Sequence, residues 1–532
     1  MPSCHRYREW CFALLLLLLT PLALRGQAPD RFFICDPTRD HIVTLRDVDG
    51  DGEFNSPGES SIYYSDLSSG PNLSVPVGLN PFKGGLLLLD GGTLDSILWL
   101  RDLDGDQTAN SEDEWQIFYD NSSPGPDLVV PRAITVASNG EIFIADEGSA
   151  ARRVLRLFDS NDDGDALDSG ESVIYFDSES FSPSVPISEP ISIAVGGDGS
   201  VYVGDSFHNW VFRCNDFDGD GTANGEEECA VFYSPPTNLA FDQFDALSID
   251  HLGRLVIVDG PSGSVLICED FNGDGDGMDP GESILIVDGA AVDSQIADPR
   301  AILPISPGQF LLGDSALDGL YRIEDLDGDG TISGALEQLV VFDDDGVSMP
   351  NPTGLALLPG TEITAVEPAI LDALGGETLS ITGHGWAEGE VVAIEIGPLS
   401  LTGTAISSSL LDVVLPPGTP GHFDVSVIAS GGTAILPDGL ELAYRILRGD
   451  VDGDSSTALN DGILIISYLV GISAEPITCL DTADVNDDGS VDLSDVIHLL
   501  SYLFIGGDLP VPPFPSAGFD PTSGVPGCDF PA

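Results

Sequence analysis

Positive charge is nearly missing from this chain of 532 residues. It holds 18 lysine and arginine residues against 88 aspartate and glutamate residues, for a formal net charge of −70, and Lys83 is the single lysine. Nucleic acids and anionic membranes bind proteins through clustered lysine and arginine. The composition therefore excludes nucleic acid as a partner and argues against binding to an anionic membrane surface.

Long apolar segments are also scarce. Arg6 and Arg8 precede an apolar run at 10–19, which is followed by Pro21 and by small or polar residues at 26–28. This order is typical of a secretory signal peptide, and the run is too short for a membrane span. We expect residues 1–27 to be removed and the mature protein to be secreted, extracellular or attached to the cell surface. No second run is long enough to cross a bilayer, so no membrane span is expected.

Cysteine is infrequent, and Cys4 and Cys11 fall within the signal peptide. Six cysteines remain, an even number that permits disulfides in an exported chain. Cys214 and Cys229 flank one acidic loop and are expected to bridge its base. Cys479 and Cys528 bracket the end of the chain and form the second expected pair, whereas Cys35 and Cys268 have no evident geometry for pairing.

Aspartate is abundant, because one acidic loop is repeated six times at steps of 54 to 57 residues. The copy at 216–228 reads DFDGDGTANGEEE. Alternate carboxylates around a tight turn, closed by a downstream glutamate, supply the oxygen ligands that Ca²⁺ requires. We predict calcium as the cofactor of all six loops. The predicted ligands are Asp47, Asp49, Asp51, Glu59, Asp102, Asp104, Asp106, Glu114, Asp159, Asn161, Asp163, Glu171, Asp216, Asp218, Asp220, Glu228, Asp270, Asn272, Asp274, Glu282, Asp325, Asp327, Asp329 and Glu337.

These loops differ from an EF-hand. Six residues separate the turn glycine from the closing glutamate, where an EF-hand has five, and strands are expected on both sides. We therefore predict hairpin loops between the two outer strands of each repeat. Gln107 replaces the turn glycine in the second copy, so that site is expected to be the weakest. The alternative is a set of acidic surface turns without ions.

Four short apolar segments per repeat predict a mainly β fold, a six-bladed β-propeller over residues 28–360. The first repeat lacks its leading strand, and the matching segment at 351–360 follows the sixth repeat, so we expect it to complete the first blade and close the ring. The stretches PRAITVASNGEIFIADEG and EPISIAVGGDGSVYVGDS resemble NHL-type repeats of six-bladed propellers. The acidic loop is an addition to that repeat.

Each second strand of a repeat ends in aspartate, which we interpret as a structural acceptor for backbone N–H groups of the next turn. An active site would instead be built from residues that break the repeat. The residues that break the repeat are His41, His208, Asn209, Trp210, His251, Arg132 and Arg300. They are not expected to converge on one site, and none of them is assigned a catalytic role.

Residues 361–445 lack the acidic loop and alternate in the manner of strands with Gly-Gly and Pro-Gly turns. The stretches GGETLSITGHGW and PPGTPGHFDVSVIASGG resemble an IPT/TIG domain, which implies an immunoglobulin-like β-sandwich that acts as a spacer or contact surface.

Residues 446–507 hold two further acidic loops, each followed by an apolar run with helical spacing. The stretch DVNDDGSVDLSDVIHLLSYLF resembles a type I dockerin, a small α-helical calcium-binding module that docks to a cohesin-type partner. The first loop departs from that pattern at Ser455, which stands in place of glycine. The predicted calcium ligands are Asp450, Asp452, Asp454, Asp461, Asp484, Asn486, Asp488, Ser490, Asp492 and Asp495. A Pro-rich tail at 508–532 is expected to be held against the module by Cys479 and Cys528.

These expectations favour a secreted calcium-binding recognition protein, attached through its C-terminal module to a cohesin-type partner or surface scaffold, over an enzyme. The alternative is a carbohydrate-active enzyme, a hydrolase or lactonase, or an accessory subunit of an extracellular polysaccharide-degrading assembly, with carbohydrate as a further candidate partner. A third alternative is a structural protein that the C-terminal module merely caps.

Overall fold

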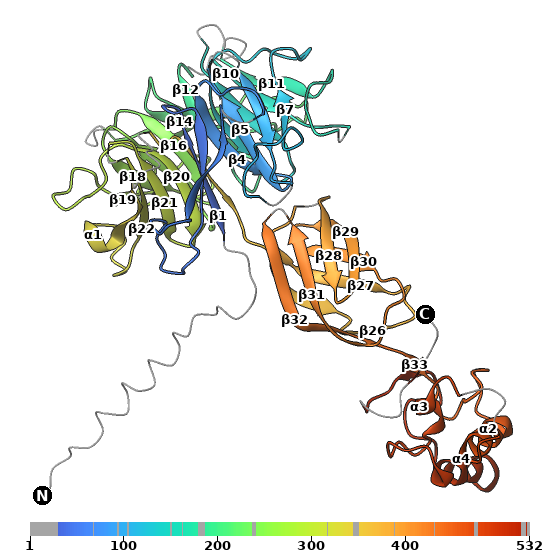
Figure 1. Ribbon diagram of the computed structural model, residues 1–532. Helices are drawn as coiled ribbons and strands as arrows, with labels where there is room; N and C mark the ends of the chain where they lie inside the picture. Colours follow the sequence, from blue (N-terminus) through green and yellow to red (C-terminus); the bar gives the residue numbers. More distant parts are fainter. Residues whose placement is uncertain are drawn as a thin grey trace, which may run out of the picture.

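The computed structural model describes residues 30–66, 69–92, 95–103, 106–148, 152–161, 163–178, 187–236, 241–316, 318–343, 351–387, 389–429, 431–472, 477–522 and 528. The expected signal peptide at 1–27 and the predicted ligand Asp104 lie outside these residues. Strands dominate the chain up to residue 446, as expected, and helices follow in the C-terminal part (Figure 1). Among the described helices, none is long and apolar enough to cross a membrane.

Six antiparallel four-stranded sheets, blades 1 to 6, form the propeller. The strands of each blade are given in hydrogen-bonded order from the inner strand outward. Blade 1 consists of β24 (Gly354–Leu358), β1 (Arg31–Asp36), β2 (His41–Leu45) and β3 (Ser60–Ser65), blade 2 of β4 (Pro76–Phe82), β5 (Gly85–Asp90), β6 (Ser96–Leu100) and β7 (Trp115–Tyr119), and blade 3 of β8 (Pro131–Val136), β9 (Ile142–Asp146), β10 (Arg153–Leu157) and β11 (Ser172–Asp177). Blade 4 consists of β12 (Pro190–Val195), β13 (Val201–Asp205), β14 (Trp210–Cys214) and β15 (Cys229–Tyr233), blade 5 of β16 (Phe244–Ile249), β17 (Leu255–Asp259), β18 (Ser264–Cys268) and β19 (Ser283–Val287), and blade 6 of β20 (Pro299–Ser306), β21 (Gln309–Asp314), β22 (Gly319–Glu324) and β23 (Gln338–Phe342).

The ring is closed as predicted from the displaced strand. β24 pairs antiparallel with β1, with Gly354 opposite Cys35 and Leu358 opposite Arg31. The last strand of the propeller therefore completes the first blade, which then has four strands like the other five.

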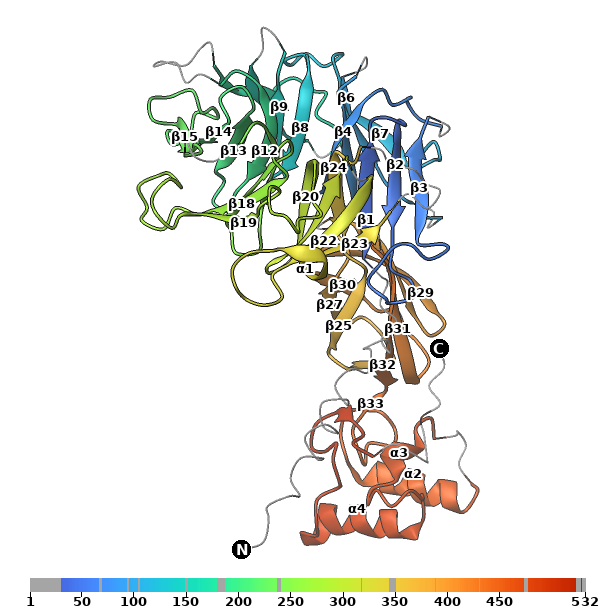
Figure 2. The same ribbon diagram turned by 90° about the vertical axis from the view of Figure 1, so that its left-hand side faces the viewer.

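The ring has two different ends. Because the strands of each blade alternate in direction, the acidic loops and the turns between first and second strands lie at one end, the loop face. The segments that enter each blade and the turns between second and third strands lie at the other end, the mouth face. β24 runs from the mouth face to the loop face, so the chain leaves the propeller on the loop face, and the next domain lies below it (Figure 2).

Apolar side chains fill the spaces between neighbouring blades. The cluster around Phe33 and Leu86, for example, draws on blades 1 and 2, and the cluster around Val203 and Phe143 draws on blades 4 and 3. Full burial of one such side chain contributes about 1.5–3 kcal/mol. The six strand-end aspartates are buried between these clusters and are structural, as expected: Asp205 accepts from Phe207 N in the next turn, and also from Ser188 N and Glu189 N in the segment entering its blade.

The second domain is the expected sandwich, in one eight-stranded hydrogen-bonded array. Its order is β25 (Glu362–Glu367), β27 (Thr378–His384), β30 (Leu410–Val414), β29 (Leu399–Ser407), β28 (Val391–Ile396), β31 (Gly421–Ala429), β32 (Gly432–Ala443) and β26 (Ile370–Asp372). Alternate residues of the strands point into a single core, which includes the buried Trp386.

The C-terminal module contains α2 (Leu459–Leu469), α3 (Leu480–Ala483) and α4 (Leu493–Ile505), as expected for two loop-helix units. Its core is small and includes Ile465, Val485 and Leu499. β33 (Arg445–Ile446) at the entry of the module pairs with β34 (Gly518–Phe519) in the tail. The short α1 (Gly334–Glu337) lies in the sixth acidic loop of the propeller.

Arg448 holds the tail against this module. Its side chain is 1% exposed, and it donates to the carbonyl oxygens of Pro512 and Asp484 and to the carboxylate of Asp520. The predicted Cys479–Cys528 and Cys214–Cys229 disulfides are both present, and Cys35 and Cys268 are buried free thiols.

Candidate metal centres and the propeller channel

The fourth acidic loop shows how the first carboxylate organises the turn. Asp216 accepts from Gly219 N and Asp220 N through one oxygen, at 2.7 and 3.1 Å, and from Gly221 N through the other, at 2.9 Å. Asp218 accepts from Asp220 N at 3.0 Å. These short-range bonds fold the acidic residues into one turn.

The closing glutamate spans the loop. Glu228 accepts from Phe217 N at 2.9 Å through one oxygen and from Gly225 N at 2.6 Å through the other. The same arrangement recurs in all six loops, and each glutamate is at most 8% exposed: Glu59, Glu114, Glu171, Glu228, Glu282 and Glu337. The glutamate thus holds the two ends of the loop together in each copy.

The sixth loop position has a left-handed backbone. Its φ lies between +75° and +104° in all six copies, a region that glycine enters without strain. Gln107 has the least positive value, +75°, and its side chain accepts a hydrogen bond from Arg46 of the preceding blade. The expected conformational penalty at the second loop is therefore present.

Predicted ligands come together in several loops. Three ligand oxygens lie within 4.8 Å of one another in the groups Asp47, Asp49 and Asp51; Asp102, Asp106 and Glu114; Asp216, Asp218 and Glu228; and Asp274, Asp276 and Glu282. Asp276 was not among the predicted ligands, although its position one residue after the turn glycine was a usable signal.

A second missed position is the tenth of the loop. Where the third residue is asparagine the tenth is aspartate, and the two are hydrogen-bonded: Asn161 donates to Asp168 at 2.9 Å and Asn272 to Asp279 at 2.7 Å. Where the third residue is aspartate, the tenth is serine or glycine. Every loop therefore carries carboxylates at positions 1, 5 and 13 and a fourth carboxylate at either position 3 or position 10. Alignment of the six copies could have revealed this pattern.

The two loops of the C-terminal module use the same scheme with a shorter closing residue. Asp461 accepts from Val451 N and Ala458 N, both at 2.7 Å, and is fully buried. Asp495 closes the second loop in the same way, accepting from Asn486 N and Asp492 N. Burial raises the pKa of Asp495, with bonds from Asp492 N and Asn486 N acting in the opposite direction.

Two other predicted ligands of this module, and the residue that replaces its first turn glycine, have local roles. Asp492 is the N-cap of α4, where its carboxylate accepts from Ser494 N at 2.6 Å. Ser490 donates its backbone N–H to Asp488. Ser455 stands at the position of the turn glycine and has φ +68°. The first loop therefore departs from the dockerin pattern in the same way as the second propeller loop, by a non-glycine residue with left-handed backbone.

Each acidic loop of the propeller is anchored to the preceding blade. The eighth loop residue donates its backbone N–H to the outer strand of that blade at 2.6 to 2.9 Å, in the pairs Phe54 to Val341, Ala109 to Tyr63, Ala166 to Phe118, Ala223 to Tyr175, Gly277 to Phe232 and Ile332 to Ile286. Scarce cations strengthen this contact: Arg31 pairs with Asp102 at 3.1 Å and Lys83 with Asp159 at 3.1 Å, each across a blade boundary. The loops therefore cross-link neighbouring blades around the ring.

The donor set of both kinds of loop consists of oxygen atoms, mostly carboxylates, on a preformed turn. Ca²⁺ takes six to eight oxygen ligands at about 2.3–2.6 Å, and several carboxylates offset its charge. The residues present therefore fit calcium.

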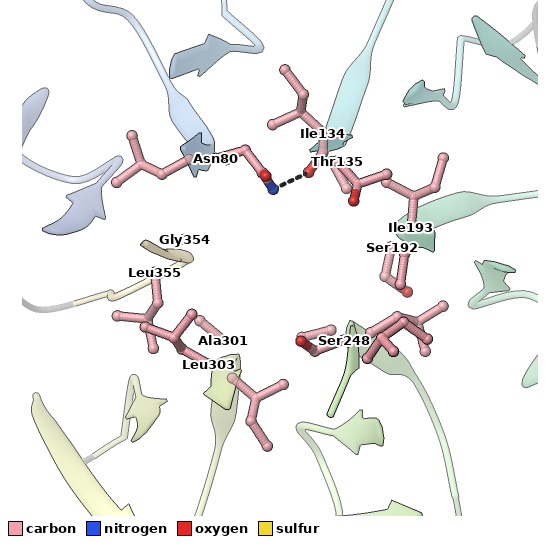
Figure 3. Close-up of a pocket in the computed structure, with 18 of the residues that line it drawn as sticks. Asn80, Ile134, Thr135, Ser192, Ile193, Ser248, Ala301, Leu303, Gly354 and Leu355 are labelled. Carbon is pink, nitrogen blue, oxygen red and sulfur yellow. Dashed lines mark hydrogen bonds between the residues drawn. The ribbon is translucent and has the colours of Figure 1, made fainter. Parts of the chain in front are cut away.

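A channel runs along the axis of the propeller, with a volume of about 380 Å³. Residues of the six inner strands point into it, and Asn80 donates to Ile134 O at 3.4 Å (Figure 3). On the mouth face it widens into a cavity of about 810 Å³, lined mainly by polar residues.

The expectation that the repeat-breaking residues do not converge is wrong for the two arginines. Arg132 and Arg300 both line the mouth cavity, because blades 3 and 6 face each other across the ring. His251 lines the channel near the loop face, and His208 lies outside both cavities, bonded to Asp205 at 2.8 Å. Burial lowers the pKa of His41, which is packed in blade 1.

Two parts of the chain match known domain families. Residues 361–444 match the IPT/TIG domain and residues 448–504 match the dockerin type I domain. Dockerin type I domains bind calcium and dock onto cohesin partners. No curated protein matches the chain.

Several solved structures share low similarity with it. The crystal structure of a nidogen/laminin complex is 14% identical, with a TM-score of 0.41, covering 62% of this chain and 98% of that chain. A virginiamycin B lyase from Staphylococcus aureus is 14% identical, with a TM-score of 0.33, covering 68% and 93%. A gluconolactonase from Xanthomonas campestris is 14% identical, with a TM-score of 0.35, covering 55% and 85%. The propeller assignment depends on the six sheets of this chain itself.

Proposed function

We propose that the protein is a secreted, calcium-binding recognition protein. Its propeller presents a binding face, its sandwich acts as a spacer, and its dockerin module attaches the assembly to a cohesin-type partner on a scaffold or cell surface. The observation that carries this proposal is the dockerin match at 448–504 together with two loop-helix units built on one scheme.

The helices of the dockerin module support a docking role. Leu459 and Ile463 on α2 are 49% and 53% exposed, and the corresponding Leu493 and Ile497 on α4 are 62% and 58% exposed. Residues four apart lie on one face of a helix. Exposed apolar pairs at the same place in both units, on a strongly acidic protein, are suited to being covered by a partner.

Calcium has a defined role in this proposal. Four carboxylates in each propeller loop repel one another, and a bound divalent cation would offset that repulsion. In the dockerin module, the cation would hold the loops from which α2 and α4 begin. The metal thus links folding of the module to its attachment.

The test measures binding of the full mature chain to a panel of immobilised cohesin domains, in millimolar calcium and in EDTA. We expect calcium-dependent binding that is lost when Leu459, Ile463, Leu493 and Ile497 are all replaced by alanine. Val391→Ala is the control, because Val391 is 68% exposed on the sandwich. Failure to bind any cohesin while calcium-loaded, or equal weakening by the control, would refute the docking role.

A further inference from the structure

The mouth cavity differs from the rest of this acidic surface in its chemistry. Thirteen of the described residues line it, and of these all but Val77 and Ile191 are polar or charged. Its volume of about 810 Å³ falls within the range of about 300–1,000 Å³ that is usual for small-molecule sites. The polar lining makes an apolar ligand a poor fit, so the question is which polar ligand the cavity suits.

The lining is built from one equivalent residue of each blade. This is the second residue of each inner strand, or in blade 1 the residue just before the strand: Thr353, Val77, Arg132, Ile191, Asp245 and Arg300. In five of these strands the register shifts at that residue, which is a β-bulge. A bulge re-aims its side chain. The repeat would place similar residues at all six positions, but three of them are charged.

Both arginines of the mouth are ion-paired, so there is no unpaired cation among the described lining residues, whereas the carboxylate of Glu189 also lines the mouth and accepts a hydrogen bond from Ser206. Arg300 donates to Asp245 at 2.6 Å and to Asp298 at 3.0 Å, and Arg132 is paired with Glu147. Asp245 also accepts from Gln243 Nε2 at 2.8 Å and from Gly260 N at 3.0 Å. With both arginines compensated by carboxylates, an anionic ligand would meet net negative charge.

What remains is a dense alternation of donors and acceptors around a concave centre. Ser206, which bonds to Glu189 at 2.9 Å, and Ser315, which bonds to Asp298 at 2.7 Å, extend this network around the rim. Each hydroxyl group of a sugar both donates and accepts, so neighbouring hydroxyls can join such paired groups.

An aromatic group stands beside this polar rim. Phe207 follows Ser206 in the turn between β13 and β14 and is 66% exposed. Behind it, His208 contacts Phe207 edge-on and stacks on Trp210, with ring centroids 4.9 Å apart in both pairs. An exposed, supported aromatic ring next to hydrogen-bonding groups suits a ligand with an apolar face and polar edges.

We propose that the mouth of the propeller binds a neutral polyhydroxylated ligand, a sugar ring of an uncharged glycan, between Arg132, Asp245 and Arg300. This inference rests on the proposed role of the propeller as the recognition domain. The mouth face is suited to it, because the sandwich and dockerin module leave the propeller on the opposite face (Figure 2).

The experiment uses calorimetric titration of the calcium-loaded full chain with soluble tetrasaccharides of glucose, xylose, mannose and galactose, and with an oligogalacturonate as the anionic probe. We expect at least one neutral oligosaccharide to bind and the anionic probe not to bind. Arg300→Ala should weaken that binding about tenfold or more, since hydrogen bonds to a charged group would be lost. Arg132→Ala is the second variant, because Arg132 is 45% exposed and its removal leaves the buried Asp245 paired.

The matched control is Arg254→Ala. Arg254 is also ion-paired, with Asp250 at 2.7 Å, but lies in a turn on the loop face. Binding that is unaffected by both mouth variants, binding of the anionic probe alone, or no binding at all would each overturn the inference. Calcium content and cohesin binding are measured on the same preparation. Neither depends on the mouth cavity, so a preparation that passes both but does not bind the oligosaccharide contradicts this inference and not the proposed function.

Discussion

The acidic loops of the propeller and those of the dockerin module are closed by the same hydrogen-bonding scheme but by different side chains. A propeller loop has thirteen residues and is closed by glutamate, whereas a dockerin loop has twelve and is closed by aspartate. Both closing carboxylates are buried, as in Glu228 and Asp461. Each of these two accepts hydrogen bonds from the backbone N–H of the second loop residue and from that of the residue three positions before itself. One extra methylene compensates for one extra backbone residue. Loop length and closing residue are therefore coupled.

The surroundings of the two kinds of loop differ more than the loops do. Each propeller loop is bonded to the preceding blade and borders a large interblade core, whereas the dockerin loops flank a core of six buried apolar residues. Burial of a few side chains barely offsets the entropy of ordering a module of this size. Calcium should thus decide folding in the dockerin module and only tighten the propeller.

Calcium removal should give the largest effect. At a calcium concentration a thousandfold above Kd, each site contributes about 4 kcal/mol, so two sites supply about 8 kcal/mol to the dockerin module. We expect EDTA to abolish the melting transition of that module and its helical circular dichroism, while the propeller still unfolds cooperatively at a somewhat lower temperature. Equal loss in both domains by calorimetry would contradict the comparison.

Removal of the disulfides should rank next. The Cys479–Cys528 bridge closes 49 residues and the Cys214–Cys229 bridge 15, so the chain-entropy estimate is about 4 and about 3 kcal/mol respectively. Cys479→Ser with Cys528→Ser should unfold the dockerin module at a lower temperature in calcium. Cys214→Ser with Cys229→Ser should destabilise the propeller less, and a reversed order would show that the small module is held by other contacts.

The mouth offers a test that should not depend on calcium. Burial raises the pKa of Asp245 to about 6, despite Arg300 beside it. This carboxyl binds its proton more tightly when folded, so its stabilising contribution is present at pH 4 and is lost as pH rises through 6. Asp245→Asn should therefore gain stability relative to the wild type across pH 4–6, by at most about 3 kcal/mol. Thermal unfolding with and without EDTA should show the same gain.

Exchange of the closing residues tests the coupling of loop length to side-chain length. Glu171→Asp should fail to reach Ser160 N or Asp168 N, and Asp461→Glu should crowd its shorter loop, each at a cost of about 1–3 kcal/mol. Unfolding of the Glu171 variants is measured without calcium, so that only hydrogen bonding changes. Unfolding of the Asp461 variant is measured in calcium, because the dockerin module is expected to unfold in EDTA. Glu171→Gln keeps the length and should cost less than Glu171→Asp. The opposite order would argue against a length match.

The smallest effect is expected at the left-handed turn position. Gln107 in the propeller and Ser455 in the dockerin module both have positive φ where other loops have glycine. Gln107→Gly and Ser455→Gly should each relieve about 1 kcal/mol of backbone strain and tighten calcium binding at their own loop. Isothermal titration of each variant measures this, and Gly164→Ala, at φ +94°, should show the reverse change.

Much of the fold was readable because its signals are local. The spacing of the acidic loops gave the blade count, the displaced segment at 351–360 predicted the ring closure, and Cys214 and Cys229 could be paired because they flank one hairpin. The strand-end aspartates were also interpreted correctly in kind, but their bonds to the segment entering the blade, fifteen to seventeen residues upstream in blades 2 to 6, were not foreseen.

The sequence by itself determined the repeat, the turn chemistry of each loop and the order of the domains, because these depend on contacts within about a dozen residues. Only the tertiary structure decided which blade each loop contacts, and that Arg132, Asp245 and Arg300 meet at one mouth although 55 to 168 residues separate them. Ring closure sets those meetings, since it brings equivalent positions of all six blades to a common axis.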